Sequence, residues 1–182
     1  MIKMKKPTAV SLNGQIESDL LKKRVKKYAD LKNFFEIVDE NISDDTVMYE
    51  VDMVLKENCD MQYAITTIHP LLVNGQCNMT QGHFHGDKDF GEIYQGISGK
   101  GALLLVDKEG NTTVEKVFPG SVHLIEGYVG HRTVNTSDEE ALKIGCYWSK
   151  HTKGYNRQAM LDCPFTINIY LENGKEKLKQ NV

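Results

Sequence analysis

The chain has 182 residues, of which 40% are hydrophobic and 26% are charged, and its formal net charge at pH 7 is −3. This length and hydrophobic content suffice for one domain with a buried core of its own, so the fold does not need a disulfide framework. A net charge this small creates no strong field for nucleic acid, and we expect no nucleic-acid partner. Small neutral or anionic substrates are not excluded.

The four cysteines form no CxxC pair and stand at Cys59, Cys77, Cys146 and Cys163. Their spacing is neither that of a zinc knuckle nor that of a dense disulfide framework, which predicts reduced and mostly buried thiols. The N-terminal sequence MIKMKKPTAV is basic, but no apolar segment of signal-peptide length follows it, and no window is long enough to span a bilayer. We therefore expect a cytoplasmic protein without a membrane partner.

A helix is predicted near the N-terminus, from Glu17 to Phe35. Apolar residues recur there at intervals of four and three, the period of one helix face, at Leu21, Val25, Tyr28 and Leu31. Ser18 is suited to cap the start of this helix. The basic residues at positions 22–27 are interpreted as a solvated face, because acidic residues flank them. Residues 1–45 are thus expected to form an N-terminal helical extension packed on the rest of a single domain.

After Thr46 the sequence changes to short runs rich in β-branched and aromatic residues. These runs are TVMYEVDMVL, YAITTI, EIYQGI, GALLLV, TTVEKVF, SVHLI, HRTVN, ALKIGCYW and TINIYLENG. Turn signals lie between them, among them Asn74-Gly75, Ser98-Gly99 and Pro119-Gly120. Many short strands separated by tight turns predict an all-β barrel or sandwich over residues 46–182. The charged tail KEKLKQNV is expected to be frayed.

One group of residues in this β region has the composition of a metal site. In Gly82-His83-Phe84-His85 two imidazoles are two residues apart, and on a strand such side chains point to the same face, about 7 Å apart along the backbone. After the turn GDKDFG, Glu92 brings a carboxylate back on the neighbouring strand, and His131 opens another strand downstream. Three imidazoles and one carboxylate predict one bound divalent ion, such as Fe²⁺, Mn²⁺, Ni²⁺ or Zn²⁺, with room left for water or substrate.

The sequence around these ligands resembles a known family, the cupin-type, archaeal-style glucose-6-phosphate isomerases. The similar segments are Thr80-Gln81-Gly82-His83-Phe84-His85, Glu92-Ile93-Tyr94, Gly99-Lys100-Gly101 and His131-Arg132-Thr133-Val134-Asn135. Others outside the ligand set follow in the same order, among them KKRVKKYADLKNFF and Met48-Tyr49-Glu50-Val51. The resemblance covers roughly residues 15–160, so it is not confined to the metal site.

The resemblance implies a cupin double-stranded β-helix barrel, a homodimer, and interconversion of glucose 6-phosphate and fructose 6-phosphate. It implies the same four metal ligands as the spacing does, and a sugar and phosphate subsite at Thr66, Thr80, Gly82, Tyr94, Tyr147 and Tyr155. A phosphate accepts hydrogen bonds readily from hydroxyls and from a glycine N–H. Isomerisation at C1 and C2 needs a base that carries a proton through an enediol, or a metal that promotes a hydride shift. Glu92 is the candidate base and Tyr94 the candidate donor, and the sequence leaves both routes open.

The chain departs from the family pattern between its last two matching tyrosines. The family has a substrate-holding histidine there, but direct register places Lys153 at that position, and His151 lies two residues earlier. Either the loop is shifted or the lysine replaces the histidine at the phosphate, and both residues stay candidates. Another cupin metalloenzyme, such as a different sugar isomerase or an oxygenase, is an alternative function, and a non-enzymatic metal or sugar sensor is a second. A sensor would need a DNA-binding module, and the sequence contains no helix-turn-helix pattern.

Overall fold

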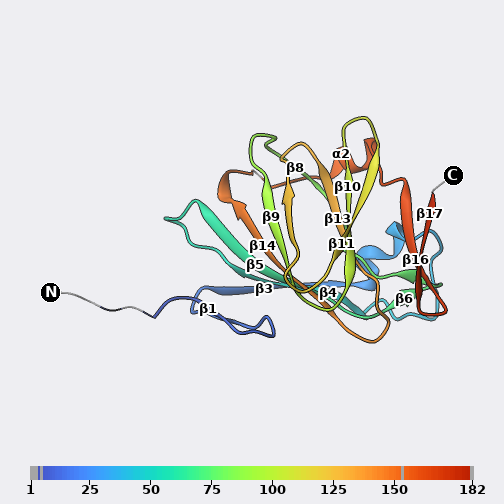
Figure 1. The fold of residues 1–182 in the computed structure, drawn as a ribbon, viewed down its shortest axis with the longest axis horizontal. Coiled ribbons are helices and arrows are strands. Elements are labelled where there is room, and N and C mark those ends of the chain that lie inside the picture. The colour runs from blue at the N-terminus through green and yellow to red at the C-terminus, as the bar shows by residue number, and fades with distance from the viewer. Residues whose placement is uncertain (1–3, 5, 153, 181–182) are drawn as a thin grey trace.

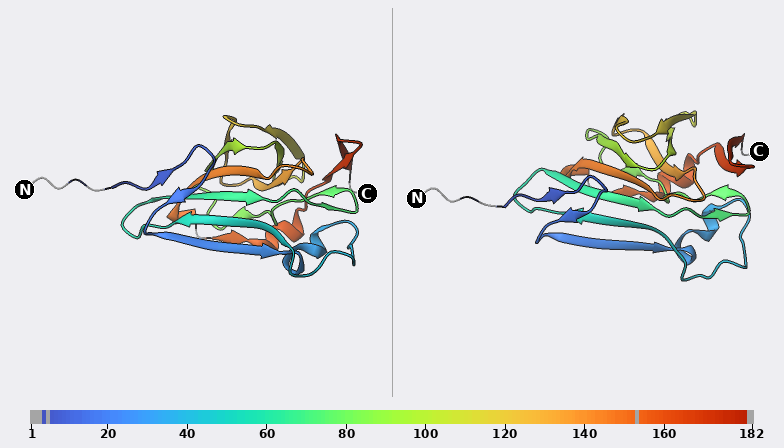
Figure 2. Two further views of the ribbon diagram at one scale, coloured as in Figure 1. Left: turned by 90° about the horizontal axis from the view of Figure 1, so that it is seen from below. Right: turned by 60° about the horizontal axis from the view of Figure 1, so that its bottom comes forward.

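β-Strands make up most of the computed structural model, which describes residues 4, 6–152 and 154–180 (Figure 1). One sheet has six strands in the order β12-β9-β14-β5-β4-β3, and a second has three in the order β11-β10-β13. The two sheets are stacked as layers (Figure 2). The prediction of an all-β fold is confirmed, and every run predicted as a strand after Thr46 contains one.

The larger sheet is antiparallel throughout and forms one wall of the molecule. Across the sheet its strands are β12 (Val122–Ile125), β9 (Glu92–Ser98), β14 (Leu142–Ser149), β5 (Met61–Ile68), β4 (Val47–Val54) and β3 (Leu21–Lys27). Side chains alternate between the two faces of each strand, so one face of this wall looks toward the core and the other looks outward.

The smaller sheet covers the inner face of this wall. Its central strand β10 (Gly101–Val106) lies between β11 (Thr112–Val117) and β13 (Gly130–Asn135), and every residue of β13 is buried. Leu103 and Leu104 of β10 share one apolar core with Ile68 and Leu142 of the larger sheet. Burial of each such side chain contributes about 1.5–3 kcal/mol relative to exposure.

Short elements close the ends of the two layers. A further sheet has the order β17-β16-β7-β6 and consists of β6 (Leu72–Val73), β7 (Gln76–Cys77), β16 (Ile167–Glu172) and β17 (Lys175–Gln180). Two pairs of short strands are β1 (Ala9–Val10) with β2 (Ile16–Glu17), and β8 (Phe84–His85) with β15 (Tyr155–Asn156). The helical turns are α1 (Tyr28–Leu31), η1 (Lys32–Phe34), η2 (Lys150–Thr152) and α2 (Arg157–Asp162). Within the described part of the chain, no helix combines the length and apolarity needed to cross a bilayer.

The predicted helix over residues 17–35 is wrong for most of its length. Residues 21–27 form β3, which pairs with β4 in the register Arg24↔Val51, and helical turns begin only at Tyr28. Leu21 and Val25, which suggested an apolar helix face, are 41% and 39% exposed. Pairing with the edge of β4 overrides the local propensity for helix. The expected short helical segment is therefore present, but it is confined to residues 28–34.

The charged tail is also more ordered than expected. Residues 175–180 form β17, which pairs with β16 through a two-residue turn at Asn173-Gly174. Both turn residues have positive φ, 52° and 72°, and this Asn-Gly pair is the preferred sequence for a tight hairpin. Residues 181–182 lie outside the described part of the chain. The four cysteines are free, as predicted, with Cys77 and Cys146 buried and the other two partly exposed.

Candidate metal centre and substrate cavity

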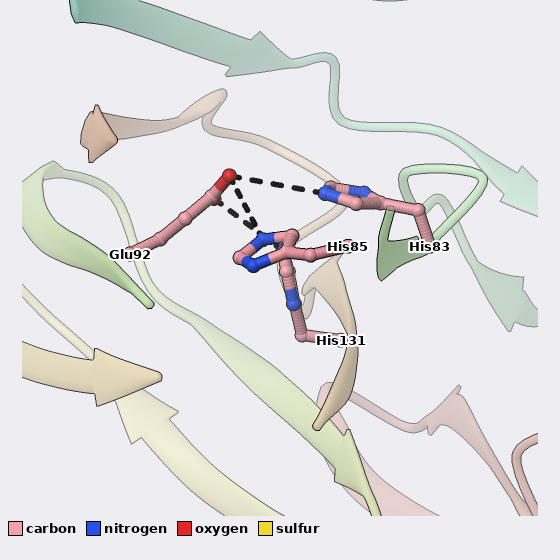
Figure 3. A group of neighbouring side chains, drawn as sticks. All are labelled: His83, His85, Glu92 and His131. Carbon is pink, nitrogen blue, oxygen red and sulfur yellow. Dashed lines mark ion pairs between the residues drawn. The ribbon is translucent and has the colours of Figure 1, made fainter. Parts of the chain in front are cut away.

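Three neighbouring strand segments bring the four predicted metal ligands together. His83 directly precedes β8 and pairs with His131 of β13, since each backbone N–H donates to the carbonyl oxygen of the other, at 3.1 and 3.0 Å. His85 is the last residue of β8, and Glu92 is the first of β9. The four side chains converge, with the three imidazoles around the carboxylate (Figure 3).

The distances within this group are those of a metal-ligand set. One Glu92 oxygen, Oε1, lies 3.0 Å from His85 Nε2 and 3.9 Å from His83 Nε2, and the other, Oε2, lies 3.5 Å from His131 Nε2. Taking one ligand atom from each residue, all four atoms lie within 4.8 Å of one another. A single ion at the centre of such a group reaches every member.

Backbone carbonyls fix the orientation of two of the imidazoles. His85 Nδ1 lies 2.7 Å from the carbonyl oxygen of Phe90, and His131 Nδ1 lies 3.4 Å from that of Val129. Because a carbonyl oxygen only accepts, each Nδ1 carries the proton and each Nε2 presents its lone pair to the group. Such contacts on the far side of the ring are a regular feature of histidines that bind metal.

The histidine nitrogens that face inward provide the test of whether the residues fit a metal. Nε2 of each histidine is buried and has no hydrogen-bond partner among the described residues. Buried polar atoms are nearly always satisfied, and leaving three together unsatisfied destabilises the fold. One divalent cation would satisfy all three nitrogens and the carboxylate at once, so the donor set fits a bound divalent metal.

Electrostatics favour the protonation states that bind metal at two of these residues. Burial, reinforced by His131, lowers the pKa of His83 to about 4, so this imidazole is neutral at pH 7. Burial alone would raise the pKa of Glu92, but the three surrounding imidazoles, His131 foremost, outweigh it and hold that pKa well below its usual range. Burial would lower the pKa of His85, but the neighbouring carboxylate of Glu92 raises it overall. The group therefore carries the negative charge of Glu92 at its centre, where a cation would be attracted.

A cavity of about 850 Å³, including its open mouth, extends from this group toward solvent. Five of the residues predicted to act on substrate line it together with the metal group, namely Thr66, Thr80, Gly82, Tyr94 and Tyr155. The ring of Tyr155 lies 4.2 Å from that of His83, and the ring of Tyr94 lies 5.4 Å from that of His131. The structure thus brings these five together with the four ligands, although they come from five separate segments of the chain.

The backbone conformation of Gly82 and the hydrogen bonding of Thr80 suit both residues to contact a ligand in the cavity. Gly82 has φ +78°, and a Cβ there would lie 3.0 Å from the Phe165 ring and 3.2 Å from the carbonyl oxygen of His131, so only glycine fits without strain. Thr80 Oγ1 accepts a hydrogen bond from the backbone N–H of Thr133 at 3.0 Å. Its own O–H therefore remains able to donate to a ligand.

Tyr94 is a neutral phenol beside the carboxylate. It is the second residue after Glu92 on β9, so both side chains point to the inner face of the sheet. Burial, followed by the negative charge of Glu92, raises the pKa of Tyr94 well above its usual value. The hydroxyl keeps its proton at neutral pH and acts as a donor.

Two other predicted substrate residues are not brought to this cavity. Tyr147 lies on the outer face of the sheet, where its ring is 4.7 Å from that of Tyr63 and lines a separate groove. His151 lies in η2, where Nε2 is 3.4 Å from Asp60 and the ring is 5.7 Å from that of Phe90. Lys153 lies outside the described residues.

Other residues of the cavity wall were missed by the sequence analysis. Those with polar or aromatic side chains include Arg24, Lys26, Tyr49, Gln81, Thr133 and Trp148. The hydroxyl of Thr133 is buried and has no partner among the described residues, so it is available to a ligand. Thr133 is two residues from His131 on β13, and Trp148 two from Cys146 on β14, so strand alternation was the signal that would have found both.

Two histidines outside the group have structural contacts, as expected. His123 contacts Glu115 through Nδ1 and Ser121 through Nε2, the latter at 3.0 Å. His69 Nε2 lies 3.9 Å from a carboxylate oxygen of Glu50. Neither lines the cavity that contains the metal group.

The family model and the curated relatives that match this sequence agree on one family. A family model described as glucose-6-phosphate isomerase matches residues 23–182. The glucose-6-phosphate isomerase of Thermococcus onnurineus (strain NA1) is 34% identical over 165 residues, which cover 88% of this chain and 86% of that protein. That of Thermococcus litoralis is 31% identical over 192 residues, covering 99% and 97%. Among solved structures, the oxalate decarboxylase of Bacillus subtilis has a TM-score of 0.48 and 21% identity, covering 59% of this chain and 27% of that one.

Proposed function

Because this chain belongs to the glucose-6-phosphate isomerase family and has a cupin fold, we propose that it interconverts glucose 6-phosphate and fructose 6-phosphate with the help of one divalent metal ion. The ligands of this ion are His83, His85, Glu92 and His131. The observation that carries the proposal is the set of three buried, unpartnered Nε2 atoms around one carboxylate, at the inner end of a cavity lined by hydroxyl groups. Fe²⁺ is the favoured ion, ahead of Mn²⁺, Ni²⁺ or Zn²⁺.

Glu92 and Tyr94 are the groups proposed to act on the reacting carbons. A bound metal would polarise the oxygens on C1 and C2, which would ease the transfer of a hydrogen from one of these carbons to the other. The ionised carboxylate of Glu92 is able to accept that hydrogen as a proton, and the phenol of Tyr94 is able to donate to an oxygen of the substrate. In a hydride shift neither side chain would carry the transferred hydrogen. Incorporation of solvent deuterium at C1 or C2 during turnover distinguishes the two routes.

The hydroxyl groups of the cavity wall are proposed to hold the substrate. Thr66, Thr80 and Tyr155 each present a hydroxyl, and Gly82 presents its backbone where no side chain is in the way. Binding energy from the phosphate end positions C1 and C2 at the metal group. Free glucose and fructose are therefore expected to be much poorer substrates than their 6-phosphates. The chain carries four free thiols, which suits a reducing compartment, and we propose the cytoplasm.

A homodimer is the proposed assembly, with the outer face of the larger sheet as its interface. Leu124, Ile93 and Tyr147 stand side by side across three strands and share that face. Leu124 is 71% exposed and Ile93 41%, and Val122 beside them is 60% exposed. An exposed apolar group of this kind is typical of an interface. Sedimentation at micromolar concentration tests this, and a monomeric wild-type chain would remove the dimer without affecting the site.

The central test of the function is a coupled assay for glucose 6-phosphate formed from fructose 6-phosphate. It is run on the chelated protein and again after each of the four metals is restored. Activity that disappears on chelation and returns with metal is the expected result. His131→Ala should stay inactive under both conditions, while His69→Ala, a histidine outside the site, should behave like the parent. Full activity in metal-free protein would refute the metal-dependent function.

A further inference from the structure

The edge strand β3 contributes two cationic side chains to the cavity wall, and the proposed function does not yet use either. Arg24 and Lys26 both line the cavity that ends at the metal group. They are two residues apart on β3, so they share one face of that strand. Arg24 pairs across the sheet with Val51, which lines the same cavity. The register of β3 therefore directs positive charge into this space.

The acidic residues near β3 leave Arg24 without a carboxylate partner. Lys23, on the opposite face, pairs with Glu50 at 3.4 Å and Asp52 at 3.5 Å. Lys26 lies 3.5 Å from Asp30. No carboxylate lies within ion-pair distance of Arg24 among the described residues, and Glu92 is the one carboxylate among those that line the cavity. The guanidinium thus keeps its full charge available for an anion.

Tyr155 connects this charge to the metal group. The Arg24 guanidinium lies within hydrogen-bonding distance of the Tyr155 hydroxyl. The ring of the same tyrosine lies 4.2 Å from that of His83. Arg24 is exposed and the ligands Glu92 and His131 are buried, so the cation lies at the open end of the cavity and the metal group at the inner end. In a hexose 6-phosphate, the phosphate and the C1–C2 pair likewise lie at opposite ends of the molecule.

We propose that Arg24 binds the phosphate group of the substrate at the mouth of the cavity, together with the Tyr155 hydroxyl, while C1 and C2 lie at the metal group; this rests on the proposed function. A guanidinium offers several N–H donors in one plane and forms paired, charge-assisted hydrogen bonds to phosphate oxygens. Arg24 is exposed, so no buried side chain has to be displaced for its guanidinium to contact a phosphate. This assignment gives Arg24 the role that the sequence analysis assigned to His151 or Lys153.

The distribution of charge supports Arg24 over His151. The His151 ring is next to Asp60 and Phe90, and this residue is not among those that line the cavity. Lys26 also faces the phosphate end, but Asp30 offsets its charge. We therefore expect Lys26 to add attraction at a distance and Arg24 to make the direct contact.

The test measures kcat and KM for fructose 6-phosphate in the metal-loaded wild type and in Arg24→Gln, Arg24→Lys and Lys22→Gln. Lys22 is the matched control, because its replacement removes one positive charge from the same face of β3, and Lys22 does not line the cavity. Loss of a charge-assisted contact should raise KM about 10-fold or more in Arg24→Gln, with kcat nearly unchanged. Arg24→Lys should recover part of the loss. Lys22→Gln should stay within about 2-fold of the parent, since exposed charges act weakly at a distance.

Two further measurements separate this inference from the proposed function. Turnover of free fructose should not change in Arg24→Gln, because that sugar has no phosphate to lose. Binding of inorganic phosphate, measured by calorimetry, should weaken in Arg24→Gln and not in Lys22→Gln. An active wild type with an unchanged KM in Arg24→Gln overturns the inference alone. If the wild type does not isomerise fructose 6-phosphate, the proposed function fails, and the calorimetry still decides whether Arg24 binds phosphate.

Discussion

Removal of the metal should lower the thermal stability of this protein, and the expected size of the effect follows from the site. The three Nε2 atoms that face Glu92 are buried and unpartnered, and they are assembled only in the folded chain. A ligand that binds only the folded state stabilises it by about 2.7 kcal/mol when its free concentration is about 100 times its Kd. For a chain of this size, 1 kcal/mol corresponds to about 2–4 °C in Tm. Metal at that concentration should therefore raise Tm by about 5–11 °C.

Loss of one ligand should nearly abolish this rise. His131 contributes one of the four ligand atoms. Loss of a residue that only hydrogen-bonds to a metal ligand already weakens metal binding about 10- to 100-fold, so loss of a ligand itself should weaken it at least as much. With a Kd about 100-fold weaker, the same metal concentration stabilises His131→Ala by only about 0.4 kcal/mol, or about 1–2 °C. The quantity compared is the rise on adding metal, because deletion of a buried imidazole lowers the Tm of the metal-free protein by itself.

Differential scanning calorimetry of the chelated protein, titrated with each divalent ion, measures these rises. His69→Ala is the control, since this histidine lies outside the cavity and contacts Glu50 instead. It should show the same metal-dependent rise as the wild type. An equal rise in His131→Ala, or no rise in the wild type with any of the four ions, would show that the group around Glu92 is not the metal site.

Three substitutions test the parts of the site separately. Glu92→Gln removes the carboxylate charge and keeps the shape, and kcat should fall about 100-fold or more, with a smaller change in KM, in the coupled assay. Tyr94→Phe removes only a donor, and its loss in kcat should be smaller in the same assay. Gly82→Ala forces a side chain into a backbone with φ +78° and against the carbonyl oxygen of His131, so denaturant unfolding should show a loss of about 1–2 kcal/mol, and metal affinity measured by calorimetry should weaken as well.

Much of the fold and the metal centre was predictable from local patterns. The strand runs after Thr46 show β-branched residues between turn signals, and both are properties of short segments of sequence. The pair His83 and His85 lies at the spacing that one strand face requires. Glu92 follows this pair after one turn and His131 lies far downstream, and β9 and β13 bring both to it. Their combination was recognisable because few structural roles require three histidines and a carboxylate.

The edge strand β3 was not predictable in the same way. Its apolar residues fall at intervals of four and three, so their spacing indicates a helix. The structure shows that Leu21 and Val25 are exposed, whereas Arg24 and Lys26, the residues on either side of Val25, line the cavity. The pattern of polarity on this strand is therefore set by a binding site rather than by the core. Apolar residues do not identify the inward-facing side of a strand where that side is polar because it lines a binding site.

The same reasoning explains why Trp148, and not Tyr147, lies in the cavity. Along β14, Ile144, Cys146 and Trp148 point to one face, so neighbouring residues point to the other. A one-residue difference in strand register moves a side chain from the cavity to the outer surface, and Tyr147 was assigned to the substrate only through the resemblance to the family. With Tyr147 outside, the wall of the cavity near β14 is an indole instead of a phenol, so it contributes apolar surface and an N–H donor there. The proposed phosphate contact therefore falls to β3, where no carboxylate among the described residues lies within ion-pair distance of Arg24.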